Sequence, residues 1–209
     1  MRVELIGITK YLGGSGTPEE LVEHAGRACY RSEPRGDPGS FIKRRVKEGH
    51  ESIIEHASAT FDIRGISRAC SHQLVRHRIA SYIQESQRYV DMAAPEYVIP
   101  PAIEGEPGSR AVLARLMDSA VETYRQLRKQ GINKEDARFV LPNATATRII
   151  VTMNFRSWRH VIRERALNPA AQWEIRELAN RVLDVLYEVA PSVFQDLVDE
   201  REKLRASGR

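Results

Sequence analysis

The pattern that most limits the fold of this chain is an amphipathic stretch between residues 109 and 130. Apolar side chains recur there at intervals of three and four residues, which is the period of a helix with one buried face. The apolar positions are Val112, Leu113, Leu116, Met117, Ala120, Tyr124 and Leu127. Gly131 follows and ends the pattern. The stretch predicts one long helix packed along a single face.

Strand-like segments are few. Residues 2–9, 56–63 and 144–153 are rich in β-branched or alternating apolar residues and predict strands. Further helices are predicted at 17–30, 40–49, 66–77, 133–142 and 170–189, after Asn154, and from Pro191 onward. Residues 88–90 and 97–99 fit short strands or extended loop, and residues 31–39 and 100–108 fit loops. With no repeat and no linker, the pattern predicts one α+β domain over residues 1–209, with sparse strands and several long helices.

Two helix starts carry specific capping signals. Thr17, Pro18 and Glu20 form a capping box with proline in the first helical turn. The preceding Gly13–Gly16 run lacks the Lys-Ser/Thr ending of a phosphate-binding loop, so a flexible turn is favoured there. Asn154 follows a buried strand and is a good N-cap residue.

Composition excludes several classes of protein. The chain has 209 residues, of which 42% are hydrophobic and 29% are charged, and its mean hydropathy is −0.44. No apolar run approaches the roughly 18–20 residues of a membrane-spanning helix. Glu4 interrupts the segment that a secretory signal would need, and Cys29 and Cys70 show no framework of disulfide bridges. We therefore expect a cytoplasmic protein without a membrane partner.

Positive charge is unevenly placed along the chain. The formal net charge is +4, and 26 of the 32 basic residues are arginine. Residues 63–84 and 137–163 contain nine arginines and no acidic residue, so the rest of the chain is acidic by five charges. Arginine holds phosphate or carboxylate through two parallel hydrogen bonds. An arginine-rich genomic composition would explain the arginine to lysine ratio equally well, but not the missing acids.

The first window leads into a dense polar segment at residues 73–89. It contains Arg76, His77 and Arg78 at the end of the predicted 66–77 helix. On an ideal helix the two arginines point about 200° apart, so they cannot clamp one phosphate together. They could contact two groups or bracket a ligand at the helix end. Ser81, Ser86 and Arg88 would follow in a loop or an edge strand.

The second window leads into a helix start at residues 154–165. Asn154 caps a helix whose free N–H groups would lie at the positive end of its dipole, which favours an anion. Helical spacing places four cationic side chains on one face of this helix. They are Arg156, Arg159, His160 and Arg163. The two windows together could hold one large anionic ligand, or two.

Other chemistries are less favoured. The histidines lack the spacing of a metal site, so no metal is expected. Cys70 is followed by Ser71 and His72, but neighbouring helical positions diverge and do not form a catalytic dyad. A small buried thiol is the simpler interpretation of Cys70.

Arg76-His77-Arg78 is followed by seven residues and Ser86, which resembles the R-H-R-x7-S signature of the flavin-dependent thymidylate synthases. The resemblance extends, in the family's order, over most of the chain. The further blocks are Gly49–Ser52, Ala137–Pro142, Asn154–Ser157 and Ala171–Arg176. It implies an α+β fold with a small, mostly antiparallel sheet flanked by long helices.

The resemblance also implies an activity. Enzymes of this family transfer a methylene carbon from 5,10-methylenetetrahydrofolate to C5 of dUMP, with NADPH as reductant through bound FAD, giving dTMP and tetrahydrofolate. No cysteine attacks the uracil ring. The family is homotetrameric, with active sites built from several subunits, so the two arginine windows would meet around FAD and dUMP phosphates.

Site residues follow from matching positions in the family motifs. The FAD contacts would be Ser52, Arg76, His77, Arg78, Gln84, Asn154, Phe155, Arg156 and His160. The dUMP contacts would be Gln73, Leu74, Val75, Arg76, Gln84, Glu85, Ser86, Gln87, Arg88, Arg138 and Arg165. Arg165 would act in catalysis by stabilising ionised uracil N3, and His50 would lie near the flavin ring and folate.

Two positions depart from the family pattern. Many members have Asn-Glu where this chain has Ile83-Gln84, so Glu85 is an alternative to Gln84 for that contact. The segment between Arg165 and Ala171 is about one residue longer than in some relatives, which makes Arg163 the alternative for the uracil role.

Two other functions compete with this hypothesis. A nucleic-acid-binding module would explain the basic pI of about 9.2, but aromatic residues are only 7% and do not alternate with the arginines as stacking platforms would. An inert homologue that binds FAD and dUMP without turnover is the second alternative. We expect small-molecule partners and no nucleic acid.

Overall fold

The computed structural model describes residues 1–34 and 36–207, so Arg35 of the expected 31–39 loop lies outside the described residues. The described chain forms two compact units. Unit 1 comprises Met1–Arg2, Ile63–Val75 and Ile83–Ile149, and unit 2 comprises Val3–Asp62, Arg76–Tyr82 and Ile150–Arg209. The expectation of one domain over the whole chain stays a prediction.

Four strands form one antiparallel sheet in the order β1-β2-β4-β3. They are β1 (Arg2–Ile8), β2 (Ser58–Ser67), β3 (Ser81–Gln84) and β4 (Ala146–Asn154). The register is visible in unit 2, where the hydroxyls of Thr60 and Thr152 meet at 2.9 Å. Together with the many helices, this small sheet confirms the predicted α+β class.

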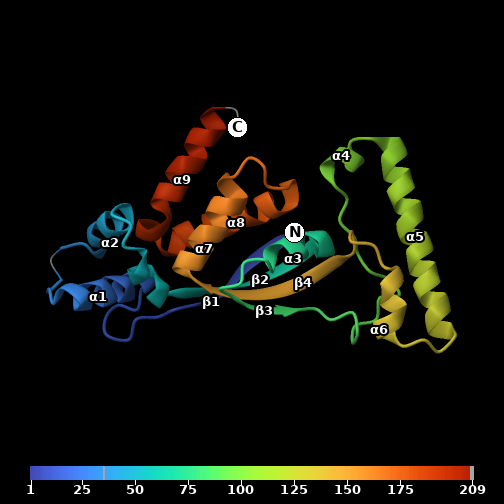
Figure 1. Cartoon of the computed structure of the whole chain (residues 1–209), viewed down its shortest axis with the longest axis horizontal. Coiled ribbons are helices and arrows are strands. Elements are labelled where there is room, and N and C mark those ends of the chain that lie inside the picture. The colour runs from blue at the N-terminus through green and yellow to red at the C-terminus, as the bar shows by residue number, and fades with distance from the viewer. Residues whose placement is uncertain (35, 208–209) are drawn as a thin grey trace. The chain divides into compact units, whose positions relative to one another are not determined.

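Unit 1 is built around the long helix foreseen from its apolar stripe. Its helices are α3 (Arg68–Leu74), α4 (Pro101–Glu104), α5 (Pro107–Lys129), α6 (Lys134–Ala137) and the 3₁₀ turn η2 (Arg138–Val140). α5 lies beside α6 (Figure 1). Buried Tyr124 of α5 packs with Met92 and Ala137, and its hydroxyl oxygen accepts a hydrogen bond from the Met92 N–H at 3.3 Å.

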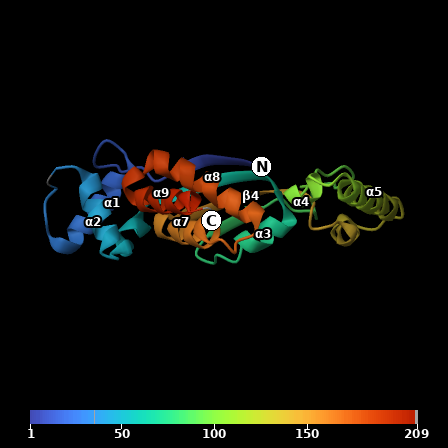
Figure 2. The same ribbon diagram turned by 90° about the horizontal axis from the view of Figure 1, so that it is seen from above.

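Unit 2 carries the remaining helices. They are α1 (Pro18–Tyr30), α2 (Pro38–Lys47), the 3₁₀ helix η1 (Glu51–His56), α7 (Phe155–Ile162), the π-helical turn η3 (Arg163–Leu167), α8 (Trp173–Val189) and α9 (Pro191–Ala206). α9 contacts both α8 and α2 (Figure 2). None of the helices in the described part of the chain is long and apolar enough to cross a membrane.

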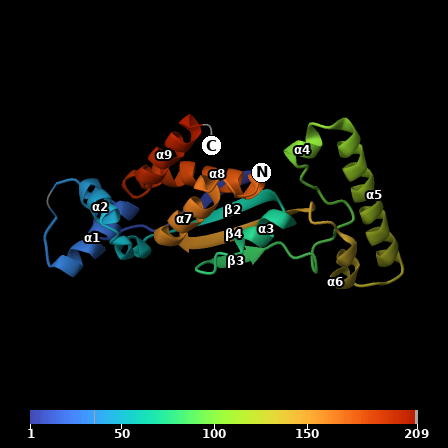
Figure 3. The ribbon, with the colours of Figure 1, turned by 45° about the horizontal axis from the view of Figure 1, so that its top comes forward.

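In unit 2, α7 lies over strands β2 and β4 (Figure 3), where aromatic side chains hold it. Trp158 packs edge-on against Phe61 of β2 with ring centroids 5.1 Å apart, and its indole N–H donates to the Ala59 carbonyl at 3.1 Å. Phe155 meets Phe194 of α9 in the same manner at 5.3 Å. Because these rings are fully buried, the orientation of α7 is set by packing on both sides.

The predicted 66–77 helix is wrong in its extent. β2 continues through Gly65, which adopts a positive φ of 69°, and the hydroxyl of Ser67 then caps α3 by accepting from the Cys70 N–H at 3.0 Å. α3 ends at Leu74, so Arg76 and Arg78 lie beyond the helix. The angular argument against their acting together therefore does not apply.

Other boundaries also differ. The strand predicted at 56–63 begins later because residues 51–56 form η1, and the 100–108 loop contains α4 and the start of α5, each with proline in its first turn. Residues 88–90 form no strand, and Tyr97 makes an isolated bridge to Thr145. The proline and glycine content of residues 100–108 is typical of a loop. Proline also favours the first turn of a helix, and that is where the prolines of α4 and α5 lie.

The capping box at the start of α1 is confirmed and can be tested. The Thr17 hydroxyl accepts from the Glu20 N–H at 3.2 Å, and the Glu20 carboxylate accepts from the Thr17 N–H at 3.1 Å. We expect Thr17→Ala to lower the free energy of unfolding by about 1 kcal/mol, measured by urea denaturation. Thr123→Ala, in the exposed middle of α5, is the control and should change it by less than about 0.5 kcal/mol. Equal losses in both variants would contradict the capping role.

Candidate active site

A cavity of about 610 Å³ lies within unit 2. Its walls come from η1, from the 76–79 loop, from the end of β4, from α7 and from the first residue of η3. The lining residues are Glu51, Glu55, Arg76, His77, Arg78, Ile79, Asn154, Arg156, Ser157, His160 and Arg163. Six of the nine predicted FAD contacts are therefore brought together around one cavity.

The start of α7 forms one wall, as predicted. The Asn154 side chain caps the helix by accepting from the Ser157 N–H at 2.8 Å. The Phe155 N–H donates to the Ala57 carbonyl at 2.8 Å. Two N–H groups expected to be free for an anion are thus already satisfied, so anion binding here depends on side chains. The Phe155 side chain is itself buried in the core.

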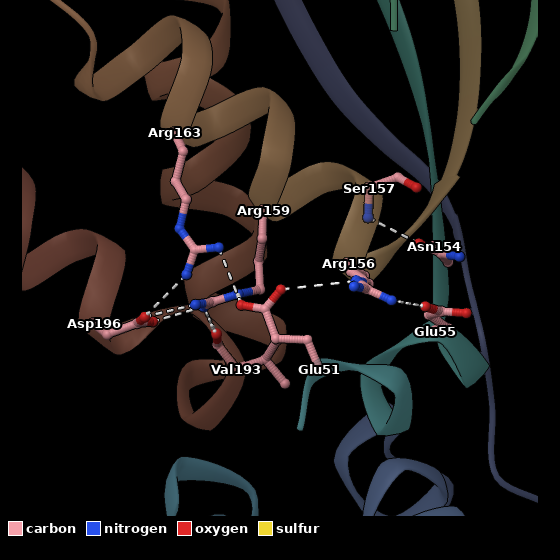
Figure 4. A network of polar contacts seen from close by, with 9 residues as sticks. All are labelled: Glu51, Glu55, Asn154, Arg156, Ser157, Arg159, Arg163, Val193 and Asp196. Carbon is pink, nitrogen blue, oxygen red and sulfur yellow. Dashed lines mark hydrogen bonds and ion pairs between the residues drawn. The ribbon is translucent and has the colours of Figure 1, made fainter. Parts of the chain in front are cut away.

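Carboxylates from distant segments neutralise the cationic face predicted on α7 (Figure 4). Arg156 pairs with Glu55, and Arg163 pairs with Glu51 at 3.0 Å. Sequence reasoning missed both acids as partners, because Glu55 and Glu51 lie 101 and 112 residues before Arg156 and Arg163.

Arg159 does not belong to the cavity wall, which corrects the expected row of four cations. Its side chain is 0% exposed and binds both carboxylate oxygens of Asp196 at 2.6 Å, with Glu51 3.5 Å away. It also donates to the Val193 carbonyl. Although burial opposes ionisation, the hydrogen bonds and charges of Arg159 and Arg163 lower the pKa of Asp196. Arg159 is thus a structural cation.

Arg76 and Arg78 differ from the arginines of α7. Both are exposed at the cavity, and within residues 1–34 and 36–207 neither has a carboxylate partner. Their loop is held by Tyr82, whose hydroxyl donates to the His77 carbonyl at 2.7 Å. Burial raises the pKa of Tyr82 to about 12, so this donor keeps its proton. The unpaired positive charge of the cavity therefore lies on a fixed loop.

His77 connects this loop to the π-helical turn. The Arg165 Nε–H donates to His77 Nε2 at 3.1 Å, and the His160 ring lies edge-on at 5.5 Å. Burial, together with the charges of Arg165 and His160, lowers the pKa of His77 to about 4. His77 is therefore neutral near pH 7 and accepts at Nε2, which leaves the terminal nitrogens of Arg165 available to a ligand.

Ser52 and His50 lie at a different cavity of unit 2, of about 340 Å³. Tyr30, exposed Cys29 and His56 also line it. Cys70, by contrast, is buried.

Most predicted dUMP residues belong to unit 1. Gln84 donates through Nε2 to the hydroxyls of Ser71 at 2.9 Å and Thr147 at 3.2 Å, so its amide is already anchored. Glu85 instead lines a cavity of about 310 Å³. Arg88 pairs with Glu135 at 2.9 Å.

The other predicted dUMP residues in unit 1 vary in accessibility. Leu74 and Gln87 are buried, whereas Val75 and Ser86 are partly exposed. Burial of Arg68 and the nearby positive charge of Arg138 both lower the pKa of Arg68. Unit 1 therefore has its own pair of neighbouring cations.

Comparisons with known proteins agree with the sequence motifs. A family described as "Thymidylate synthase complementing protein" matches residues 11–192. Proteins named flavin-dependent thymidylate synthase from Mycobacterium avium and Mycobacterium tuberculosis are each 42% identical, and the one from Mycobacterium marinum is 41% identical. Each match covers 94% of this chain and 89% of the relative.

The lowered pKa of His77 predicts a pH-dependent stability. An unfolded histidine titrates near 6.5, so the unfolded chain binds more protons between about pH 4 and 6.5, and the free energy of unfolding should rise with pH in that range. His77→Gln should flatten this rise in denaturation curves collected at several pH values. His72→Gln, at an exposed position on α3, should retain it. Parallel pH profiles for His77→Gln and the unmodified protein would contradict the assignment.

Proposed function

This chain belongs to the thymidylate synthase complementing protein family, whose curated relatives are flavin-dependent thymidylate synthases, and we propose that it converts dUMP to dTMP. It is an enzyme of thymidylate synthesis that uses a flavin. In the proposed reaction, 5,10-methylenetetrahydrofolate donates the methylene carbon, NADPH supplies two electrons, and tetrahydrofolate is released.

The observation that carries the proposal is the pair of arginines, Arg76 and Arg78, that line the 610 Å³ cavity with no carboxylate partner in the described part of the chain. A dinucleotide cofactor has a diphosphate that needs cations without competing carboxylates, and Arg76 and Arg78 meet this requirement. The cavity volume lies in the range of cofactor sites, about 300–1,000 Å³. The donor set of the cavity thus fits FAD.

The residues that would hold FAD have separable tasks. Arg76 and Arg78 would bind its diphosphate, while Asn154, Arg156 and His160 would contact the cofactor along the α7 wall. His77 would contribute a neutral ring. Ser52, Gln84 and Phe155 complete the proposed contacts, Phe155 through its main chain because its side chain is buried. When bound, FAD supplies hydride-transfer chemistry between NADPH and the one-carbon unit.

The dUMP site is proposed from the remaining motif positions. Ser86, Arg88 and Arg138 would bind the nucleotide, together with Arg76 and the main chain or side chains of Gln73–Val75 and Gln84–Gln87. Arg165 would direct its terminal nitrogens at uracil N3 and stabilise the N3 anion, which raises electron density at C5. No cysteine is assigned a role as nucleophile.

A homotetramer with sites shared between copies is also proposed. This proposal rests on the resemblance to the family; within one chain, the FAD residues lie mainly in unit 2 and the dUMP residues mainly in unit 1. His50 would lie near the folate.

Flavin binding tests the cavity directly. The purified protein should be yellow, or become so with added FAD, and should release tritium from 5-tritiated dUMP when folate and NADPH are present. The double variant Arg76→Gln/Arg78→Gln should bind FAD at least about tenfold more weakly, because two charge-assisted contacts are lost. Arg44→Gln, at an exposed position on α2, should bind normally. A colourless protein that FAD cannot reconstitute would refute the proposed function.

Arg165→Ala tests the uracil role separately. We expect the variant to keep its flavin spectrum and lose most turnover, about 100-fold or more, because an electrostatic contact to the reacting ring is removed. Arg163→Ala is the matched comparison, and a larger loss there would transfer the role to Arg163. Unchanged turnover in Arg165→Ala would remove Arg165 from catalysis.

A further inference from the structure

Two aromatic side chains of unit 2 meet at the 340 Å³ cavity. Tyr30 is the last residue of α1, and His50 immediately precedes η1. The Tyr30 hydroxyl lies 2.6 Å from His50 Nδ1, and the two rings are nearly parallel, with 9° between their planes. This short polar contact accompanies a stacked pair of rings.

Arg45 fixes the direction of that hydrogen bond. Its Nη1 lies 3.3 Å from the Tyr30 oxygen. A guanidinium can only donate, so the tyrosine oxygen accepts from Arg45. Among the described residues, the acceptor within reach of the tyrosine hydrogen is His50 Nδ1. The reverse arrangement would place two donors, the guanidinium N–H and an imidazole N–H, on one oxygen, and would leave the hydroxyl hydrogen without an acceptor among the described residues. In its neutral form, His50 therefore carries its proton on Nε2.

Arg45 is itself immobilised. It forms an ion pair with Glu48 at 2.8 Å, and its guanidinium lies over the rings of Tyr30 and Phe41, 5.0 and 5.7 Å from their centroids. Glu48 and the two rings thus orient Arg45, Arg45 orients the Tyr30 hydroxyl, and the hydroxyl orients His50. Within residues 1–34 and 36–207, no hydrogen bond occupies His50 Nε2.

We propose that Tyr30 is a positioning residue that holds His50 as the Nε2–H tautomer, so that His50 offers a hydrogen-bond donor to a carbonyl or ring nitrogen of the folate pterin. This role rests on the proposed function, which places His50 near folate. The Nδ1–H tautomer would instead present a lone pair at Nε2, which repels such an acceptor. The tyrosine therefore selects the form of histidine that can bind the co-substrate.

The first test measures the tautomer without using activity. The full-length protein is labelled with ¹⁵N-histidine, and long-range ¹H–¹⁵N spectra are recorded near pH 8, with the His50 signals assigned from a His50→Gln variant. We expect unmodified His50 to show a protonated Nε2 and an unprotonated Nδ1. Tyr30→Phe should shift both signals toward averaged values while the ring stack is kept.

The chain offers a matched control. The Tyr11 hydroxyl lies 3.2 Å from His24 Nδ1, with both residues outside the lining of the cavity. Tyr11→Phe removes the same kind of hydrogen bond and should leave the His50 signals unchanged. Unaltered His50 signals in Tyr30→Phe would overturn the proposal.

The second test measures the consequence for the co-substrate. Tyr30→Phe should raise the KM for methylenetetrahydrofolate about threefold to tenfold, with kcat within about twofold and flavin content unchanged. Tyr11→Phe should leave both constants unchanged. A shifted tautomer with an unchanged KM would overturn the folate role of the Tyr30–His50 pair. If the unmodified protein makes no thymidylate, the proposed function fails, and the tautomer measurement alone decides whether Tyr30 positions His50.

Discussion

The buried guanidinium of Arg159 is the interaction on which the geometry of unit 2 depends. A charge that is fully removed from water is stable only when its partners are in place, and removal of one partner is costly. Here the three partners come from two other elements, namely Asp196 and the Val193 carbonyl of α9 and Glu51 of η1. α7 cannot bury Arg159 unless α9 and η1 are docked. The same helix face carries Arg156 and Arg163, so the docking also fixes the cavity wall.

The distribution of charge in space differs from its distribution along the chain. The second arginine window contains no acid, yet its cations on α7 are met by Glu51, Glu55 and Asp196. Among the residues that the structure describes, positive charge at the cavity remains unpaired at Arg76 and Arg78, in the loop after α3. Pairing therefore concentrates the electrostatic attraction for an anion at one edge of the cavity.

Local rules predicted the parts of the fold that depend on neighbouring residues. The capping box at Thr17, the Asn154 cap and the long stripe of α5 each involve side chains within a few positions of one another. The motif residues also identified six lining positions of one cavity.

Features that depend on distant contacts were not predictable from those rules. α3 begins later than its composition suggests, because β2 runs past Gly65 and Ser67 then caps the helix start. The acids that neutralise α7 lie more than a hundred residues from their arginines, as in the Arg156–Glu55 and Arg163–Glu51 pairs. Arg159 is buried because α9 docks against it. The spacing of residues 154–165 gives no sign of this contact. The π-helical geometry of η3 likewise has no local signature.

Because of the π-helical turn η3, the position of Arg165 depends on the number of residues in the turn more than on their identity. η3 accommodates about one residue more per turn than an α-helix would. It directly follows β4 and α7, and the buried rings of Phe155 and Trp158 hold α7 in place. A helix advances by about 100° per residue, so deleting residue 163 or 164 would rotate Arg165 away from His77 even though the remaining residues are unchanged. During evolution, insertions and deletions in this turn would therefore be selected against even where substitutions are tolerated.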